Sequence, residues 1–327
     1  MASQKLITVC IATFNRAEVV SKLIQELLDF DLNEKIEILV IDDCSSDNTF
    51  ERISRFNKYD NVTILKNDQN LSRARTQLKY FNLCQTEYLI ELPDDEILYK
   101  EGLLELLQLL PTLDVDFLST RWTDTTGLYY GGRGSDVIQE ISLTNLRIQS
   151  EHSIGCVFRS SIIKFSEEEI LRRLEQDCAA AFFYHQNIVL LIAKLNNLKL
   201  LSSPILLGGY RPEGPVIGKL TDSQGNCYTS LPAAINKYFG MKSLYADCLN
   251  KYHNSKFSKE LKSLSDTHNM SLYSVVEDAL GYNNDTEASI LVKNLKAGSS
   301  RNFLNPYQAC RHFLKFISVK LKAFQYR

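Results

Sequence analysis

Three consecutive carboxylates end a mainly apolar stretch close to residue 90. Residues 89–92 have the length and composition of a strand, and after one proline they are followed by Asp94, Asp95 and Glu96. Carboxylate oxygens are hard ligands that suit Mg²⁺ or Mn²⁺. The alternative is an ordinary turn, because proline and aspartate are common in turns for backbone reasons alone.

A second pair of acids, Asp42 and Asp43, follows an apolar run at 36–41 that also reads as a buried strand. In a doubly wound sheet the carboxyl ends of parallel strands lie at one edge, and open α/β folds bind their ligands there. We therefore expect both acidic strand ends to line the same crevice.

The elements that would position these acids alternate between strand and helix. We expect strands at 6–12, 36–41, 62–65 and 88–92, and helices at about 19–28 and 71–83. Asn15 is the candidate N-cap of the first helix, with Glu18 three residues further on, as a capping box requires. This alternation predicts an α/β fold with a mostly parallel, Rossmann-like sheet and covering helices.

Composition and missing motifs exclude several classes of protein. The 327 residues carry a formal net charge of −2, so nothing attracts nucleic acid in general and we expect no nucleic-acid partner. Eight scattered cysteines without a C-x-x-C pair favour reduced thiols in a cytoplasmic protein. The glycine fingerprint of a dinucleotide site does not follow the first strand, and no phosphate-binding P-loop is present. We expect neither an export signal nor a membrane span.

Four segments together carry a resemblance to a known family. They are 9–16 (VCIATFNR), 38–49 (ILVIDDCSSDNT), 70–75 (NLSRAR) and 92–96 (LPDDE). Their order, their attachment to strand ends and their spacing over about the first hundred residues resemble the successive signatures of family 2 glycosyltransferases with the GT-A fold. The resemblance implies a nucleoside diphosphate sugar as donor and Mn²⁺ or Mg²⁺ as cofactor.

The resemblance also implies roles for particular residues. The turn after the first strand and Asp43 would hold the nucleoside, Asp94 would reach the ribose, and Asp95 would bind the metal that bridges the diphosphate. Arg73 and Arg75 would meet phosphate, although a solvated helix face is an equal alternative for both. The residues expected to bind the nucleotide sugar are Ala12, Thr13, Asn15, Arg16, Asp43, Arg73, Arg75 and Asp94.

The base that activates the acceptor is not identifiable from the family pattern. Members usually begin a later helix with an acidic pair, whereas this chain has His185 and Gln186 at the matching position. His185 is a candidate base because its ordinary pKa lies near neutral pH. Asp177 and Glu175 are the alternatives, and a helix-start histidine without a chemical role is equally consistent with the sequence.

The rest of the chain divides into an acceptor half and a helical extension. We expect a catalytic domain over 1–218, with a nucleotide-sugar half at about 1–100 and an acceptor half at about 101–218, followed by a mainly helical region at 219–327. The aromatic, glycine-rich stretch 120–153 is either a sugar-binding lid or a hairpin packed on the core. The basic amphipathic segment 307–327 either contacts an anionic membrane or packs as a terminal helix.

These inferences favour a hexosyl- or related sugar transferase that acts, with inversion, on a glycan hydroxyl. By analogy with bacterial relatives of this size, we expect a role in surface polysaccharide synthesis, a lipid-linked glycan acceptor, and a place in the cytoplasm or on the inner face of the cell membrane. A sugar nucleotidyltransferase is disfavoured, since the turn at 13–16 contains no glycine. The remaining alternative is a catalytically inactive GT-A module that acts as a glycan-binding or partner subunit.

Overall fold

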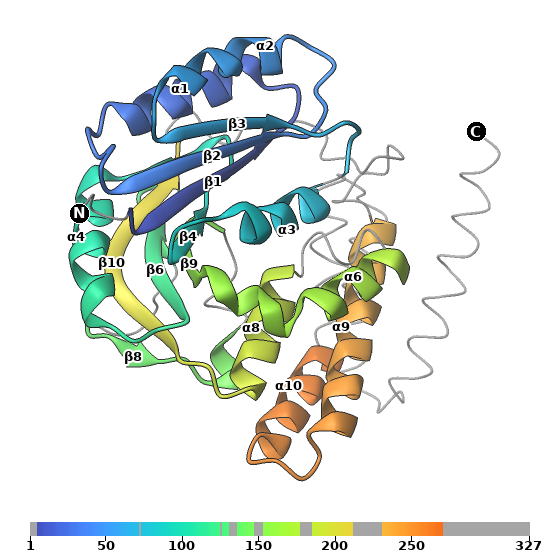
Figure 1. The fold of residues 1–327 in the computed structure, drawn as a ribbon. Helices are drawn as coiled ribbons and strands as arrows, with labels where there is room; N and C mark the ends of the chain where they lie inside the picture. The colour runs from blue at the N-terminus through green and yellow to red at the C-terminus, as the bar shows by residue number, and fades with distance from the viewer. Residues whose placement is uncertain are drawn as a thin grey trace, which may run out of the picture.

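The computed structural model describes residues 5–71, 73–124, 126–130, 136–146, 153–176, 185–211 and 231–270. Its centre is a mixed sheet of 10 strands, in which eight follow the order β3-β2-β1-β4-β9-β6-β10-β5, while β7 pairs with β6 and β8 with β10. Helices cover the sheet on both sides (Figure 1). The predicted α/β fold with covering helices is confirmed.

The first half of the sheet is parallel. Its strands are β1 (Ile7–Thr13), β2 (Ile36–Asp42), β3 (Val62–Lys66) and β4 (Tyr88–Glu91). Ile7 is in register with Ile36 on one side and with Tyr88 on the other, so β1 is central. A central strand buries both of its faces, which explains its nearly continuous apolar sequence. All four strands lie within one residue of the predicted bounds at their first residue.

The second half mixes directions. Its strands are β9 (Cys156–Arg159), β6 (Phe117–Thr123), β10 (Leu200–Tyr210), β5 (Glu96–Leu98), β7 (Tyr129–Tyr130) and β8 (Gln139–Glu140). β9 runs antiparallel to both β4 and β6, while β10 is parallel to β6. β10 is one continuous strand of 11 residues, with shifts in its register to β6 between Ser202 and Gly208. Such a shift is typical of a β-bulge, which bends a strand without ending it.

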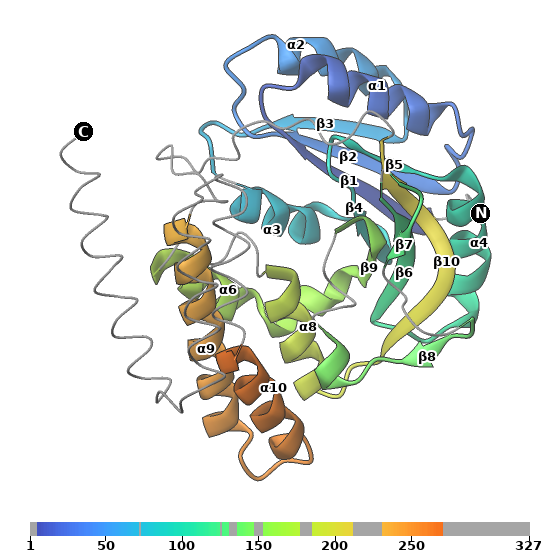
Figure 2. The ribbon, with the colours of Figure 1, turned by 180° about the vertical axis from the view of Figure 1, so that it is seen from behind.

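Two apolar layers flank the sheet. One layer contains α1 (Ala17–Leu28), α2 (Thr49–Ser54) and α4 (Lys100–Leu109). The other contains α3 (Arg73–Leu83), α6 (Glu167–Gln176), α8 (His185–Leu195), α9 (Leu231–Lys251) and α10 (Ser258–Met270). Short 3₁₀ turns lie at Arg55–Lys58, Leu110–Thr112, Leu143–Asn145, Ser153–Gly155 and Ser160–Phe165. Figure 2 shows α1 and α2 on one side of β1–β3 and α3 on the other.

The side chains of β1 supply both layers in alternation. Val9 and Ile11 pack toward the layer of α1, whereas Cys10 packs toward the layer of α3. Each of these side chains is fully buried, and residues that alternate between two packed layers cannot slip in register without turning inside out. The strand is therefore a fixed base for the polar turn that follows Thr13.

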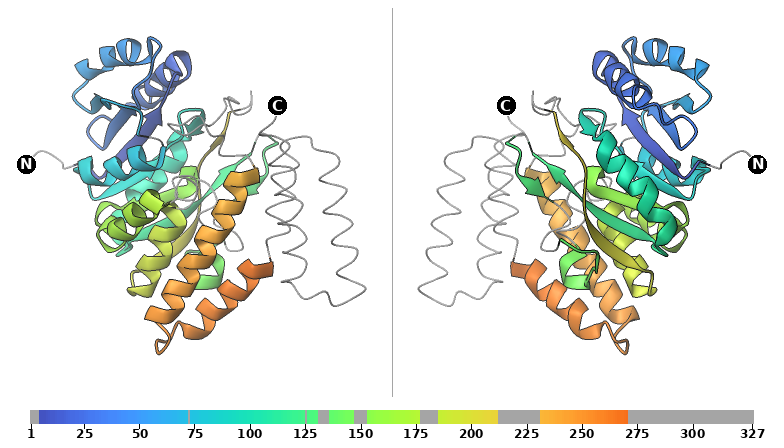
Figure 3. Two further views of the ribbon diagram at one scale, coloured as in Figure 1. Left: turned by 90° about the vertical axis from the view of Figure 1, so that its right-hand side faces the viewer. Right: turned by 90° about the vertical axis from the view of Figure 1, so that its left-hand side faces the viewer.

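The later helices extend away from the parallel half of the sheet. Figure 3 shows α9 and α10 (orange) as a pair at the opposite end of the molecule from α1 and α2 (blue). Among the helices that the structure describes, none combines the length and the apolar character needed to cross a bilayer. The segment 307–327, for which membrane contact was considered, lies outside the described residues.

Candidate active site

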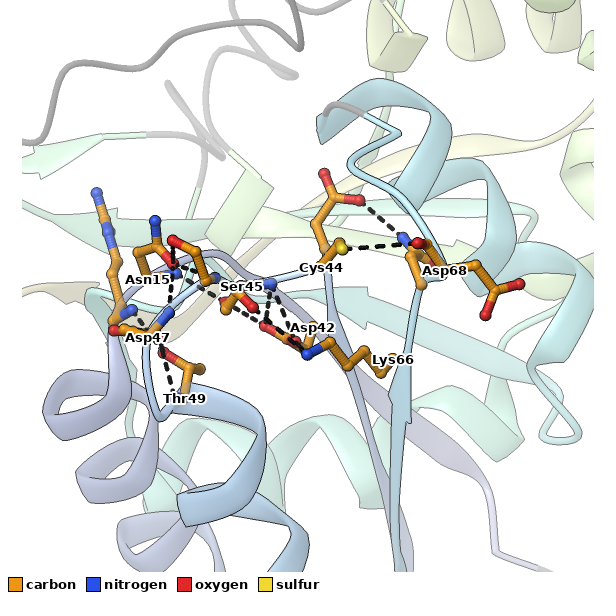
Figure 4. Close-up of polar contacts among 12 residues, drawn as sticks. Asn15, Asp42, Cys44, Ser45, Asp47, Thr49, Lys66 and Asp68 are labelled. Carbon is orange, nitrogen blue, oxygen red and sulfur yellow. Dashed lines mark hydrogen bonds and ion pairs between the residues drawn. The ribbon is translucent and has the colours of Figure 1, made fainter.

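The turn that follows β1 is bonded to the turn that follows β2. The Asn15 side-chain oxygen accepts a hydrogen bond from the backbone N–H of Ser46 at 2.8 Å, and the Asn15 N–H donates to the Ser45 hydroxyl at 2.8 Å. Asn15 has a φ of 54°, in the left-handed region that asparagine tolerates better than most residues. Figure 4 shows Asn15 facing Ser45 and Asp47 across the two turns.

The predicted N-cap role of Asn15 is wrong. The residue before α1 is Arg16, and no side chain caps that end of the helix. Instead the Asn15 side chain serves the neighbouring turn, and the Arg16 N–H donates to the Thr49 hydroxyl at 3.0 Å. The two turns therefore form one connected polar unit at the edge of the sheet.

The two acids that end β2 have different surroundings. Asp42 is fully buried and accepts from the Ser45 N–H at 3.2 Å, so it stabilises the turn from within. Burial raises the pKa of Asp42, and hydrogen bonds from Ser45 partly oppose that rise. The N–H of Asp43 donates to the carbonyl of Thr13 at 2.9 Å, which places Asp43 beside the end of β1.

The Asp43 carboxylate is held by three donors on a single oxygen. Its Oδ1 accepts from the Asn67 amide at 2.8 Å, from the Leu71 N–H at 2.9 Å and from the Thr76 hydroxyl at 2.9 Å. Within the described part of the chain, no donor reaches its Oδ2. The carboxylate is thus fixed by one oxygen, and the other is able to accept from a ligand.

Asp94 and Asp95 meet the turn after β1 through Thr13 and Arg16. The Thr13 hydroxyl donates to Asp94 Oδ2 at 2.8 Å, and Arg16 Nη1 donates to Asp94 Oδ1 at 2.7 Å. The same Arg16 nitrogen lies 3.0 Å from Asp95 Oδ2. The two acidic strand ends therefore reach one edge of the sheet, as the order of the strands predicts.

The pKa values of Arg16 and Asp94 each depend on burial and on the charge of the partner. Burial would lower the pKa of Arg16, but Asp94 and Asp95 outweigh it and raise that pKa above its ordinary value. Burial raises the pKa of Asp94, whereas the charge of Arg16 acts in the opposite direction. Arg16 therefore remains cationic, and a guanidinium nitrogen at 2.7 Å favours the ionised form of Asp94.

Glu96 differs from the two aspartates that precede it. The residue is 7% exposed, and its Oε2 atom is buried with no hydrogen-bond donor among the described residues. Burial, followed by the charge of Asp95, raises the pKa of Glu96 to about 8, although Arg73 acts against this. The three consecutive acids thus differ. Asp94 and Asp95 both contact Arg16, whereas Glu96 is buried with one oxygen that accepts no hydrogen bond from the described residues.

The remaining predicted residues are only partly placed. Ala12 lies in β1, and Arg73 and Arg75 are half-buried on α3, where Arg73 contacts the Ser153 hydroxyl at 3.5 Å. His185 is the first residue of α8, but its side chain lies outside the description. Asp177 also lies outside the described residues, and Glu175 is exposed on α6.

Trp122 does not suit a role in a sugar-binding lid, because it is buried beside the ring of Tyr210.

A divalent ion would have to use a small set of protein oxygens. Within the described ranges, no group of three or more His, Cys, Asp or Glu side chains is arranged to hold a metal ion. Mg²⁺ is often bound by one or two carboxylates together with substrate phosphates, so a complete protein cage is not required. The Asp95 side chain, which is 16% exposed and lies at the same sheet edge as Asp43 and Asp94, fits such a shared ligand set.

Comparisons with known proteins identify the family and the fold. The class defined by the fold and the acidic sheet edge is the GT-A type of α/β protein. The sequence pattern described as "Glycosyl transferase family 2" matches residues 8–173, just over half of the chain. The chain therefore belongs to glycosyl transferase family 2. No curated protein matches its sequence.

Two solved structures show the likeness of the fold. S. aureus TarS 1–349 in complex with UDP-GlcNAc has a TM-score of 0.55 and 16% identity, with 85% of this chain and 73% of that chain covered. The mannosyltransferase PcManGT from Pyrobaculum calidifontis, in complex with GDP-Man and Mn²⁺, has a TM-score of 0.51 and 15% identity, with 97% and 87% covered. At such low identity the likeness establishes the fold alone.

Proposed function

We propose that this protein transfers a sugar from a nucleoside diphosphate donor to a hydroxyl of a glycan, with the help of Mn²⁺ or Mg²⁺. The observation that carries the proposal is the convergence of Asp43, Asp94 and Asp95 with the turn Thr13–Arg16 at one sheet edge of a family 2 chain. Structures of similar fold hold UDP-GlcNAc in one protein, and GDP-Man with Mn²⁺ in another.

Asp43 is the proposed acceptor for the nucleobase. Three donors fix its Oδ1, so its Oδ2 points away from them with little freedom to rotate. A carboxylate oxygen held in this way can accept an N–H of a base without a further loss of side-chain entropy. The turn at 13–16 would lie against the nucleoside, and Asn15 keeps that turn in shape through its bond to Ser46.

Asp94 and Asp95 are proposed to act on the ribose and the diphosphate. Both oxygens of Asp94 already accept hydrogen bonds, but each can accept a second one, so a ribose hydroxyl can still bind there. Asp95 would hold the divalent ion together with the diphosphate. When bound, that ion supplies charge stabilisation to the departing nucleoside diphosphate. Arg73 and Arg75 are proposed to lie along the phosphates.

Transfer by a single displacement with inversion requires a base near the acceptor hydroxyl. His185 and Asp177 are the proposed candidates, and Glu175 is less suitable because it is exposed on α6. A neutral imidazole at the start of α8 would take the proton of the hydroxyl as that oxygen attacks the sugar.

The proposed setting is the synthesis of a bacterial surface polysaccharide. The acceptor would be a glycan carried on a lipid, and the protein would act in the cytoplasm, at the inner face of the membrane. The basic residues and phenylalanines of 307–327 support this proposal, because a basic amphipathic segment can bind an anionic lipid surface.

A panel of nucleotide sugars tests the proposal directly. Thermal shift and calorimetry with UDP- and GDP-sugars, each with Mn²⁺ or with EDTA, should identify one nucleotide that binds, and nucleoside diphosphate release should follow when a glycan acceptor is added. If a nucleotide sugar binds but no acceptor leads to release of the nucleoside diphosphate, the inactive GT-A module is favoured. If no nucleotide sugar stabilises the protein, the proposed function is wrong.

Asp43→Asn sharpens this experiment. The amide oxygen of asparagine can keep the three donors of Oδ1, while an NH₂ group replaces the oxygen that would accept from the base. We expect nucleotide affinity to fall at least tenfold with little change in melting temperature. Asp68→Asn, in the exposed turn after β3, is the matched control and should bind nucleotide normally.

A further inference from the structure

The positively charged side chain of Arg16 lies between the carboxylates of Asp94 and Asp95. Arg16 Nη1 is 2.7 Å from Asp94 Oδ1 and 3.0 Å from Asp95 Oδ2, so a single nitrogen contacts both acids. The backbone of Arg16 is anchored separately, since its N–H donates to Thr49 at 3.0 Å. The long side chain can therefore change partners while the turn stays in place.

The two acids hold Arg16 unequally. Asp94 is the more buried, with 9% of its side chain exposed, and the Thr13 hydroxyl fixes it from the other side at 2.8 Å. Asp95 has 16% of its side chain exposed and contacts Arg16 at the longer distance. Removing the cation from Asp94 would leave a buried charge without compensation, whereas Asp95 can exchange it for a ligand at lower cost.

We propose that Arg16 is the resident cation of the donor site, which releases Asp95 only when a nucleoside diphosphate offers its phosphates to the guanidinium. The inference rests on the proposed function and adds a regulation of the same site. A planar guanidinium matches phosphate oxygens as well as carboxylates, so the incoming diphosphate is a natural competitor for Arg16. Asp95 is freed for a divalent ion at the moment when the donor arrives.

This exchange makes metal and nucleotide binding depend on each other. A divalent ion alone must compete with Arg16 for Asp95, and two cations at one carboxylate repel each other. Once the guanidinium turns to the phosphates, the two negative phosphate groups offset the repulsion between Arg16 and the divalent ion. By linkage, nucleotide must strengthen metal binding by the same factor as metal strengthens nucleotide binding.

The decisive measurement uses Mn²⁺ alone, followed by electron paramagnetic resonance or calorimetry without nucleotide. We expect Arg16→Gln to bind Mn²⁺ on the order of tenfold more tightly than the wild type. Arg16→Lys should be intermediate, because an ammonium is a point charge that satisfies Asp94 but spans both acids less well. Circular dichroism establishes that each variant is folded. Unchanged Mn²⁺ affinity in both folded variants would overturn the proposal.

Arg159→Gln is the matched control for Arg16→Gln, because it also replaces an arginine cation by a neutral amide. Arg159 also faces several acids, with its Nη1 2.5 Å from Glu87, but it is the last residue of β9 and lies at the opposite edge of the sheet. Its replacement should leave Mn²⁺ binding unchanged. An equal gain in Mn²⁺ affinity in this variant would mean that any lost cation raises metal binding, and the special role of Arg16 would fail.

Asp95→Asn gives a second test that leaves Arg16 intact. In EDTA, this variant should bind the nucleoside diphosphate identified by the nucleotide-sugar panel several-fold more tightly than the wild type, since Arg16 no longer has to leave a charged partner. With Mn²⁺ it should gain little further affinity. If its affinity in EDTA equals that of the wild type, Arg16 is not held back by Asp95 and the proposal is wrong. If no nucleotide binds to the wild type, the proposed function itself fails.

Discussion

Two arginines of this protein each face several carboxylates, and they lie at opposite edges of the sheet. Arg16 follows the carboxyl end of β1 and contacts Asp94 and Asp95, whose side chains are 9% and 16% exposed. Arg159 ends β9 beside the first residue of β4, at the amino edge. The same residue types are therefore present twice, in settings that differ in burial.

The acids around Arg159 are open to solvent. Glu87 and Asp114 have 50% and 97% of their side chains exposed, and only Asp116, at 27%, is partly covered. Arg159 also donates to the carbonyl of Val115 at 3.0 Å, so part of its role is to join strands. Water and salt screen such ion pairs, and each contributes little to stability.

The comparison indicates that burial, rather than residue type, distinguishes the proposed site from a surface ion-pair cluster. We call the sheet edge with Thr13, Arg16, Asp43 and Asp94 the donor edge, because the nucleotide sugar is proposed to bind there. Thr13 orients Asp94 and the Leu71 N–H helps to orient Asp43, so these acids are fixed before a ligand arrives. Acids at the Arg159 edge are free to be hydrated. Preorganised charge in a partly dry site is what lets a protein stabilise charge that develops on a substrate.

The largest difference between the two edges should appear in turnover. Asp95→Asn removes the proposed metal ligand, and we expect sugar transfer to fall by between a hundredfold and a thousandfold. Glu87→Gln, which removes the closest acid from Arg159, should leave the rate within a factor of two. Steady-state assays of nucleoside diphosphate release compare the two variants. Equal losses of turnover in the two variants would mean that the two edges do not differ in their role.

The second prediction concerns stability and pH. Glu96 has an ordinary pKa of 4.5 that rises to about 8 in the folded protein, so between these values the folded state binds more protons than the unfolded chain. Stability must therefore decrease as pH rises from about 4.5 to about 8, and then level off. Glu96→Gln should remove this decrease and be more stable than the wild type by about 4 kcal/mol at pH 8.

Urea unfolding in EDTA at pH 5, 6.5 and 8 measures the effect of Glu96→Gln. Glu101→Gln, on the exposed side of α4, is the matched control and should follow the wild-type pH profile. A wild-type profile that is flat over this range would show that Glu96 is solvated or paired. A confirmed decrease would mean that the donor edge holds its acids at a cost in stability, which the Arg159 edge does not bear.

Much of the donor edge could be predicted from strand patterns alone. Acids that follow 36–41 and 88–92 had to meet if both strands were parallel, and Asp43 and Asp94 do lie on either side of Thr13. What the sequence could not show is which way long or flexible polar side chains turn. Arg16 reaches an acid 78 residues away, and Asn15 a backbone N–H 31 residues away.

Other features depended on context that a local pattern does not contain. The support of Asp43 by Asn67 and Thr76 was missed, although Asn67 directly follows β3 and its position at a third strand end was a usable signal. The burial of Glu96 was also missed, because three adjacent acids look equally solvated in a sequence. The base near α8 and the domain boundary at 218 stay predictions.

The third prediction tests how Asp94 is oriented. Thr13→Val removes the hydroxyl that donates to Asp94 Oδ2 and keeps the side-chain shape, so the unfolding free energy should fall by about 1.5 kcal/mol, as for a bond to a charged group. Nucleotide affinity should fall about fivefold because Asp94 can then rotate. Thr120→Val, which loses a buried bond to the carbonyl of Gly155, should lower stability without changing nucleotide affinity.

The smallest effect is expected at the most exposed acid of the Arg159 edge. Asp114→Asn removes a carboxylate that lies 3.4 Å from Arg159 with 97% of its side chain exposed, so its charge is already screened by water. Turnover should not change, and denaturation curves of variant and wild type should coincide at low and high salt. A clear loss of stability that disappears at high salt would show that the exposed edge also works as an electrostatic unit. Burial would then no longer separate the two arginines.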